Sequence, residues 1–322
     1  MKPKVFVIIV NWNGEVDTIS CLTSLSQVVY EAMHVLISDN GSKPESLSAI
    51  RSWINLNVGV DSDRGISSCR IIENRINLGF TGANTSGIKV AFENGADYIL
   101  FLNNDTTVES GFLSTMVCVA ESQERYGIIG SKILTREKDD QSGRFKIWSL
   151  GGYGWKRGVP INLCGGTLDS SSLAGVRENA MINGCCMLIK RAVIEEIGVQ
   201  DDDLFFGMDD AEFSLRAWRR GWINAIALDA KIYHIGSHAV EAGSPLQAYY
   251  LFRNMLFFRV KYFSWHENVV FFMNYWVRYV LIGCSIRAIA GRGVVNRGVW
   301  LGIRDFFAGN MGECRHKAIM KS

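Results

Sequence analysis

The sequence has little proline and no paired-cysteine motif. Four prolines occur in 322 residues, and no low-complexity run or internal repeat is visible, which argues against long disordered or fibrous segments. The eight cysteines form no CxxC pair, so a zinc ribbon or a redox motif is not expected. The apolar run Val5–Val10 is too short for a signal-peptide core and predicts a first strand. We therefore expect a cytoplasmic protein with reduced thiols.

Two common nucleotide-binding signatures are also missing. The sequence contains no GxxxxGK[ST], which excludes a P-loop, and no GxGxxG follows the first strand, which weighs against a dinucleotide fold. The net charge of +2 is unevenly divided, because eleven Lys or Arg and three Asp or Glu occur from Tyr249 onward. That region therefore carries +8 and the first 248 residues carry −6. Its basic residues lie among apolar helices instead of on a polar stripe, so no nucleic-acid partner is expected.

Apolar runs alternate with helical patterns over the first hundred residues. Four runs predict buried strands at Val5–Val10, His34–Ser38, Cys69–Ile72 and Tyr98–Leu102. Helical patterns separate most of them, so we expect an α/β fold with a mixed, mostly parallel sheet flanked by helices.

Polar residues follow each of these strands, at positions 11–14, 39–42, 77–84 and 103–105. Because the carboxyl ends of parallel strands lie along one edge, these residues are predicted to share one crevice. Asp105, after two asparagines, is suited to a divalent cation and the phosphates that it bridges. The alternatives are that Asn and Gly are ordinary turn formers, and that Asp105 caps the next helix or simply ends a strand.

A second acidic group occurs at residues 201–212. Five carboxylates fall within ten residues there, and a helix with Asp209 and Asp210 in its first turn follows. Helix capping accounts for one of the pair, whereas the whole cluster indicates a proton-transfer or cation site. Further on, His234 and His238 are four residues apart, but the glycine between them argues against a helical zinc pair. A structural role for His234 remains the alternative to a ligand role.

Seven segments taken together resemble the family 2 glycosyltransferases of GT-A fold, especially their bacterial rhamnosyltransferase-like branch. They occur in order over roughly residues 4–258, and each alone is a weak signal. The segments are Val7–Gly14, Ile37–Ser42, Asn77–Phe80, Leu102–Thr106, Met208–Arg216, His234–Ser237 and Tyr249–Asn254.

The resemblance implies a division of the chain and a set of donor-binding residues. Residues 1–248 would be the GT-A catalytic domain, with a nucleotide-sugar half at about 1–108 and an acceptor half at about 109–248. Residues 249–322 would be an aromatic, basic, helical extension. The residues that it places beside the nucleotide sugar are Asn11, Trp12, Asp39, Asn77, Gly79, Phe80, Asn84, Asn103, Asn104 and Asp105.

The resemblance also implies catalytic and metal-binding roles. Asp210 matches the general base, with Asp209 beside it, and Asp105 with His234 would hold Mg²⁺ or Mn²⁺. Two departures from the family pattern occur. Asn103 stands where the first acid of the DxD motif is usual, and an Asp-Asp pair replaces the more frequent Glu-Asp.

The implied activity is an inverting sugar transfer from a nucleotide diphosphate sugar, UDP- or dTDP-linked, to a hydroxyl of a saccharide or lipid-linked saccharide in cell-surface polysaccharide synthesis. One alternative is a sugar nucleotidyltransferase, which usually begins with a basic Gly-rich loop that Asn11–Gly14 does not match. The other is a non-catalytic sugar-nucleotide-binding or scaffold protein, against which the joint presence of Asp39, Asp105 and Asp210 argues.

The C-terminal region is rich in aromatic and basic residues. Between Asn268 and Ile286 the only charge is Arg278, near the centre, where an arginine costs about 3 kcal/mol in a membrane span. A helix pair on the inner leaflet, with basic residues on anionic head groups, fits better than a span. The alternative is that these helices pack on the catalytic domain or form a homodimer.

Overall fold

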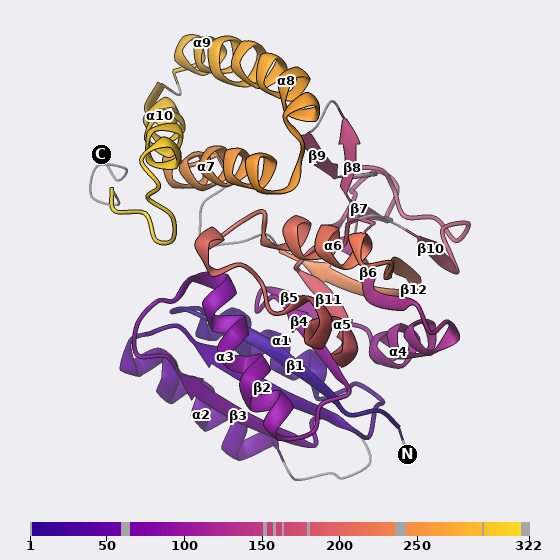
Figure 1. Ribbon diagram of the computed structural model, residues 1–322. Coiled ribbons are helices and arrows are strands. Elements are labelled where there is room, and N and C mark those ends of the chain that lie inside the picture. Colours follow the sequence, from indigo (N-terminus) through magenta and orange to yellow (C-terminus); the bar gives the residue numbers. More distant parts are fainter. Residues whose placement is uncertain are drawn as a thin grey trace.

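The computed structural model describes residues 2–58, 65–150, 153–156, 159–162, 164–178, 181–235, 243–291 and 293–316. The first hundred residues alternate strand and helix, as the apolar pattern predicts (Figure 1). Their elements are β1 (Val5–Asn11), α1 (Glu15–Leu25), β2 (Met33–Asp39), α2 (Pro44–Asn57), β3 (Ser68–Glu73), α3 (Gly79–Glu93) and β4 (Tyr98–Leu102).

The described residues between 106 and 234 add eight strands, and six of these belong to the same sheet. Their strands are β5 (Thr106–Val108), β6 (Tyr126–Lys138), β7 (Phe145–Ser149), β8 (Tyr153–Lys156), β9 (Val159–Asn162), β10 (Val176–Glu178), β11 (Cys186–Lys190) and β12 (Ile223–His234). Their helices are α4 (Phe112–Ser122), α5 (Arg191–Ile197), a 3₁₀ turn (Asp202–Leu204) and α6 (Asp209–Arg219).

The described strands form a ten-stranded sheet and a separate β8–β9 hairpin. The order is β10-β12-β6-β11-β4-β1-β2-β3, with β5 paired to β12 and β7 to β6. β1, β2, β3 and β4 are parallel, and β11 runs antiparallel to both β4 and β6. The predicted mixed, mostly parallel sheet is therefore confirmed, and strands of both predicted halves belong to it.

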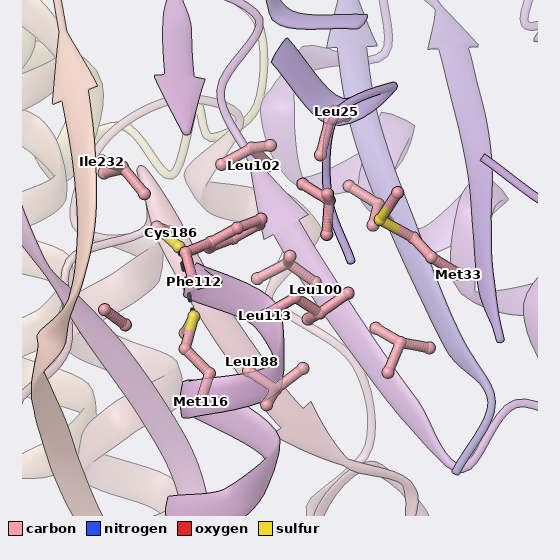
Figure 2. Packing of buried hydrophobic residues seen from close by; sticks show 14 of the residues in the cluster. Leu25, Met33, Leu100, Leu102, Phe112, Leu113, Met116, Cys186, Leu188 and Ile232 are labelled. Atoms are coloured by element: carbon pink, nitrogen blue, oxygen red, sulfur yellow. Dashed lines mark hydrogen bonds between the residues drawn. The ribbon is translucent and has the colours of Figure 1, made fainter. Parts of the chain in front are cut away.

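Helices cover both faces of this sheet, which is why its central strands are apolar throughout. One face packs on α1, α2 and α4, and the other on α3, α5 and α6. Figure 2 shows the first face, where Leu100 and Leu102 of β4 meet Phe112, Leu113 and Met116 of α4. Burial on both faces fixes the strands rigidly, so the residues at their ends are held at defined positions.

Helices after residue 244 form a further layer, above α6 in Figure 1. It consists of α7 (Pro245–Tyr262), α8 (Trp265–Asn274), a π-helical segment (Tyr275–Ile282), α9 (Gly283–Ile289) and α10 (Gly293–Phe307). Ser264 and Glu267 form a capping box that starts α8. Phe252, Met255 and Leu256 of α7 pack with Leu204 and Leu215, which precede β12 in the chain. The helical extension is thus docked on the sheet domain through an apolar interface.

Two glycines bring α10 unusually close to α7. A Cβ on Gly298 would lie 1.9 Å from the carbonyl oxygen of Pro245, and one on Gly302 would lie 2.4 Å from that of Tyr249. Backbone approach of this kind requires residues without a side chain. The close packing of α10 against α7 therefore depends on both glycines.

Gly298→Ala is expected to lower the free energy of unfolding by about 1–3 kcal/mol, because the added methyl group has no room and the helices must separate. Gly293→Ala in the same helix is the matched control, since nothing lies within 4 Å of its Cβ position. That control should be neutral or slightly stabilising, because Ala favours helix over Gly. Urea unfolding of both variants checks this, and equal stabilities would refute the tight contact.

Candidate active site

The ends of β1 and β2 hold each other through side chains. Asn11 and Asp39 are register partners, and Asn11 Nδ2 donates to Asp39 Oδ1 at 2.9 Å. The backbone N–H of Ser42 donates to Asp39 Oδ2 at 3.0 Å. Both side chains are buried, whereas the neighbouring Trp12 is 43% exposed. The structure therefore brings these three predicted donor residues together at one edge, with the Asp39 carboxylate fixed in orientation.

Asn40 fixes the loop that precedes α3. Its Nδ2 donates to the carbonyl of Gly79 at 2.9 Å and to Asn77 Oδ1 at 3.1 Å. Its Oδ1 accepts from the N–H of Leu78 at 3.1 Å. This buried amide thus anchors predicted donor residues to the end of β2. Asn40 lies inside the segment Asp39–Ser42, but its contact with the loop before α3 cannot be inferred from the sequence.

The same loop contacts the acidic segment more than a hundred residues later. The N–H of Phe80 donates to the carbonyl of Phe205 at 2.7 Å. Gly79 has φ +76°, and a Cβ there would lie 2.4 Å from that carbonyl oxygen. The predicted donor loop and the predicted catalytic segment are therefore in direct contact.

Asp105 and His234 meet because β5 pairs antiparallel with the end of β12, in a register that places His234 opposite Thr106. His234 Nε2 lies 3.1 Å from Asp105 Oδ1, and both side chains are buried. Asp105 Oδ2 and His234 Nδ1 have no hydrogen-bond partner, and the contact of His234 Nε2 with Oδ1 lacks hydrogen-bond geometry. Buried polar atoms are rarely left unsatisfied, so a carboxylate and an imidazole in this state fit a bound cation.

The described residues contain no group of three or more His, Cys, Asp or Glu that could hold a metal ion. Asp105 and His234 are therefore the charged or imidazole groups among the described residues that would hold a cation at this edge. His238, the second histidine of the sequence pattern, lies outside the described residues.

The two asparagines before Asp105 have different surroundings. Asn104 Nδ2 donates to Thr18 Oγ1 at 3.2 Å and to the carbonyl of Gly14 at 3.4 Å. Asn103 is half-buried, and its carbonyl accepts from Thr106 Oγ1 at 2.7 Å. Asn104 thus ties the end of β4 to the start of α1, and a donor contact for either residue remains a prediction.

The thiols near Asp105 are buried and neutral in this structure. Burial, with a smaller contribution from the charge of Asp105, raises the pKa of Cys21 to about 12 and that of Cys185 well above its usual value. Because the thiolate is the reactive form, these cysteines remain neutral packing residues.

The adjacent carboxylates at the start of α6 face different partners. Asp209 is buried and accepts a hydrogen bond from Gln200 Nε2 at 3.0 Å, while Gln200 Oε1 accepts from Asn84 Nδ2 at 3.0 Å. Asp210 is half-buried, and its Oδ2 accepts from the N–H of Gly184 at 3.1 Å. Asp209 therefore faces the protein interior and α3, whereas Asp210 is the more exposed of the two.

Burial, reinforced by the neighbouring charge of Asp210, raises the pKa of Asp209 to about 7. An acid with this pKa in a closed environment is held partly protonated near neutral pH. Neither Gln200 nor Gly184 stood out in the sequence as a functional residue, because each acts through a partner that is distant along the chain.

Two consecutive backbone groups connect Asp210 to the end of β4. Gly184 donates its N–H to Asp210, and the carbonyl of Cys185 accepts from the N–H of Asn103 at 3.0 Å. The site thus joins a buried Asp-His pair, a half-buried carboxylate and the polar ends of β1 and β2.

Comparisons with known proteins identify the family of this chain. A family model described as glycosyl transferase family 2 matches residues 6–198, more than half of the chain. The dTDP-rhamnosyl transferase RfbF of Shigella flexneri is 24% identical over 262 residues, covering 79% of each chain. An N-acetylglucosaminyl-diphospho-decaprenol L-rhamnosyltransferase of Mycobacterium tuberculosis is 23% identical over 245 residues, covering 71% of this chain and 76% of its own.

Two solved structures show the same fold. GalNAc-T7 with UDP, GalNAc and Mn²⁺ superposes with a TM-score of 0.59 at 15% identity, over 78% of this chain and 47% of that one. The mannosyltransferase PcManGT of Pyrobaculum calidifontis, with GDP-Man and Mn²⁺, has a TM-score of 0.56 at 12% identity, over 95% and 88% of the two chains. The fold is GT-A, as the sequence resemblance implied, and the chain belongs to glycosyl transferase family 2.

Proposed function

We propose that this protein transfers a sugar, with inversion, from a nucleotide diphosphate sugar to a hydroxyl group of a saccharide or lipid-linked saccharide in cell-surface polysaccharide synthesis. The observation that carries the proposal is the link between Gly184 and Cys185, which holds Asp210 beside the strand end that bears Asp105. A one-step displacement of the nucleoside diphosphate requires a general base and a diphosphate-binding group close together in the same site.

The relatives support a donor and acceptor class. RfbF is named a dTDP-rhamnosyl transferase, and the mycobacterial relative is named for a diphospho-decaprenol acceptor. We propose a dTDP- or UDP-linked hexose or deoxyhexose as donor and a polyprenyl-diphosphate-linked saccharide as one acceptor. Asn11, Trp12 and Asp39 are proposed to bind the nucleoside part, because they lie together at the open ends of β1 and β2.

Asp210 is the proposed general base and Asp209 a supporting acid. An acceptor hydroxyl is too weakly acidic to attack unaided at neutral pH, so a carboxylate must remove its proton. Asp210 is half-buried and accepts backbone N–H groups of Gly184 and Ala211, whereas Asp209 is enclosed and bonded to the side chain of Gln200. Displacement on the face opposite the leaving group implies inversion at the anomeric carbon.

Asp105 and His234 are the proposed holders of Mg²⁺ or Mn²⁺. Their three unsatisfied buried atoms and their carboxylate-imidazole chemistry fit such an ion. When bound, a divalent cation there supplies positive charge beside the leaving diphosphate.

We further propose that the protein lies on the inner face of the cell membrane through its C-terminal helices. The helix Trp265–Ile289 is long and apolar enough to cross a membrane by length and composition, and 24% of its most apolar window is buried. Exposed apolar residues recur along it at helical spacing. They are Trp265, Val269, Val270, Met273, Val277, Leu281, Ile282, Ile286 and Ile289.

An anionic bilayer surface is the proposed occupant of this apolar face. Residues 249–322 carry +8, and Arg278 is exposed on the same helix. Basic residues beside an apolar face are the combination that binds anionic lipid at the interface. Peripheral attachment would also bring the site to a lipid-linked acceptor.

A thermal-shift screen of UDP, dTDP, GDP and CMP, each with and without Mn²⁺, tests the site. We expect UDP or dTDP to raise the melting temperature in a Mn²⁺-dependent way, since a ligand at 100 times its Kd stabilises by about 2.7 kcal/mol. Asp105→Asn should lose the Mn²⁺-dependent part. A screen in which no nucleotide stabilises the protein would contradict the proposed donor.

Asp210→Asn is the companion variant in that screen. It should keep the full nucleotide shift while release of nucleoside diphosphate from the sugar nucleotide falls by about 10²- to 10⁴-fold. Near-normal turnover in Asp210→Asn would refute its role as base.

Asp209→Asn is expected to be more stable than the wild type at pH 8, by roughly 2–4 kcal/mol, because each unit of pKa shift corresponds to about 1.4 kcal/mol. The folded-state pKa of Asp209 is raised to about 7, so folding retains a proton that the unfolded chain releases near pH 4. Stability of the wild type therefore falls as pH rises through this window.

Urea unfolding of Asp209→Asn at several pH values between 4 and 8 checks this expectation. The advantage of the variant should shrink toward pH 4, where both states of the wild type are protonated. Asp203→Asn, exposed in the same segment, is the control. A constant difference between variant and wild type at all pH values would contradict the proposed cost of ionising Asp209.

Flotation with liposomes tests the membrane proposal. The full-length protein should float with anionic vesicles and not with neutral ones, and less so at high salt. A variant with Met273, Val277 and Leu281 changed to Ser should remain in the bottom fraction of the gradient. The control Val16→Ser with Leu56→Ser changes two residues of the sheet domain that are even more exposed, and it should float. Failure of the wild type to float, or a smaller oligomer in the helix variant, would assign this face to another copy instead.

A further inference from the structure

The turn between the 3₁₀ segment and α6 has a strained backbone. Phe205 has φ +58°, Gly207 +78° and Met208 +68°, and two of these three residues carry side chains. For Phe205 and Met208, which carry side chains, such conformations are strained and persist only where surrounding contacts enforce them. Asp209 and Asp210 follow directly, so the path of this turn decides where both carboxylates lie.

Asn254 of α7 binds the carbonyls of this turn. Its side chain is fully buried, and its Nδ2 donates to the carbonyls of Leu204, Phe206 and Gly207 at 2.9, 2.9 and 3.0 Å. The two N–H groups of one amide thus reach three backbone carbonyls of the turn, at least one of the hydrogens being shared between two acceptors. Hydrogen bonds of this kind define the turn more tightly than apolar packing does, because they depend on direction.

Arg253 extends the contact to the C-terminal segment. Its guanidinium is fully buried and donates to the carbonyl of Gly312 at 2.7 Å and, more weakly, to that of Leu204 at 3.4 Å. Its Nε donates to Asn254 Oδ1 at 3.0 Å, which orients that amide. A buried cation is costly unless such acceptors surround it, so this arrangement is a built feature of the fold.

The other side of the turn rests on the predicted donor loop. The carbonyl of Phe205 accepts from the N–H of Phe80, and Gly79 leaves no room for a Cβ at that contact. Asn40 holds this loop to β2 independently of the turn. Loosening the turn should therefore displace the α6 carboxylates more than the nucleotide-binding residues.

We propose that Arg253 and Asn254 are positioning residues for sugar transfer, which hold the strained Leu204–Met208 turn so that Asp210 lies where the acceptor hydroxyl is deprotonated. This inference rests on the proposed function, since it assigns the base role to Asp210. It makes the C-terminal helical layer a part of the catalytic machinery, although that layer supplies no group to the reaction itself.

The same layer contains a matched pair that does not contact the turn. Asn268 Nδ2 donates to the carbonyls of Arg259 and Phe263 at 3.1 and 3.0 Å, and Arg259 Nε donates to Asn268 Oδ1 at 3.0 Å. Both side chains are buried. Asn268→Ala therefore removes the same kind of buried amide from the same layer without touching the turn.

The experiment compares Asn254→Ala with Asn268→Ala in the full-length protein. Three quantities are measured: the melting temperature, the Kd of the nucleoside diphosphate that stabilises the wild type, and kcat and KM for release of that nucleotide from its sugar nucleotide with water as acceptor. Hydrogen exchange of residues 203–211 is followed in parallel.

Both variants should lose similar stability, and only Asn254→Ala should lose kcat, by about 10- to 100-fold, since a small displacement of a reacting group costs that much. The Kd and KM should stay within about threefold of the wild type, because Asn40 still anchors the donor loop. Exchange should accelerate at residues 203–211 in Asn254→Ala and not in Asn268→Ala.

Equal loss of kcat in the two variants at equal melting temperature would overturn the positioning role. Parallel loss of kcat and nucleotide affinity in Asn254→Ala would overturn it too, because the turn would then act on donor binding. If the wild type releases no nucleotide from any sugar nucleotide, the proposed function is wrong. Independently of that result, unchanged hydrogen exchange at the turn in Asn254→Ala would overturn the positioning role.

Discussion

Hydrogen bonding between the parallel strands β4, β1 and β2 is the constraint on which the site depends. It fixes the register that sets Asn11 beside Asp39 and brings the end of β4 to the same edge. Helices on both faces bury these strands, so the edge cannot shift without opening the core. The loops beyond that edge then hold one another through side-chain amides, of which Asn40 and Asn254 each serve several backbone groups.

The sequence predicts those features that arise within a few residues of one another. Apolar runs followed by Asn, Asp or Gly identify β1 to β4 and the polar edge, because burial and turn chemistry are local signals. The contact of Asp105 with His234 depends on pairing between β5 and β12, and composition does not encode that pairing. The sequence also does not show that Asp209 is buried whereas Asp210 is partly exposed. The two residues are adjacent and of the same type, and only their orientation at the start of α6 gives them different neighbours.

Burial determines which groups at the site are charged. Asp209 is buried and accepts a hydrogen bond from Gln200. Burial also keeps the thiols around Asp105 neutral. A low dielectric strengthens every remaining electrostatic interaction at the site. Asp105 and His234 retain unsatisfied atoms in this environment, which costs stability in the free protein and favours a bound ion.

The contact between Arg253 and the carbonyl of Gly312 affects the order in which parts of the chain can fold during synthesis. Domains fold from the N-terminus as a chain leaves the ribosome, so the sheet and its polar edge can form while residues near 310 are still inside the tunnel. The turn before α6 then lacks one of its supports. A nascent chain would therefore form the polar edge of the sheet before it fully supports this turn, so the two regions reach their folded state at different stages of synthesis.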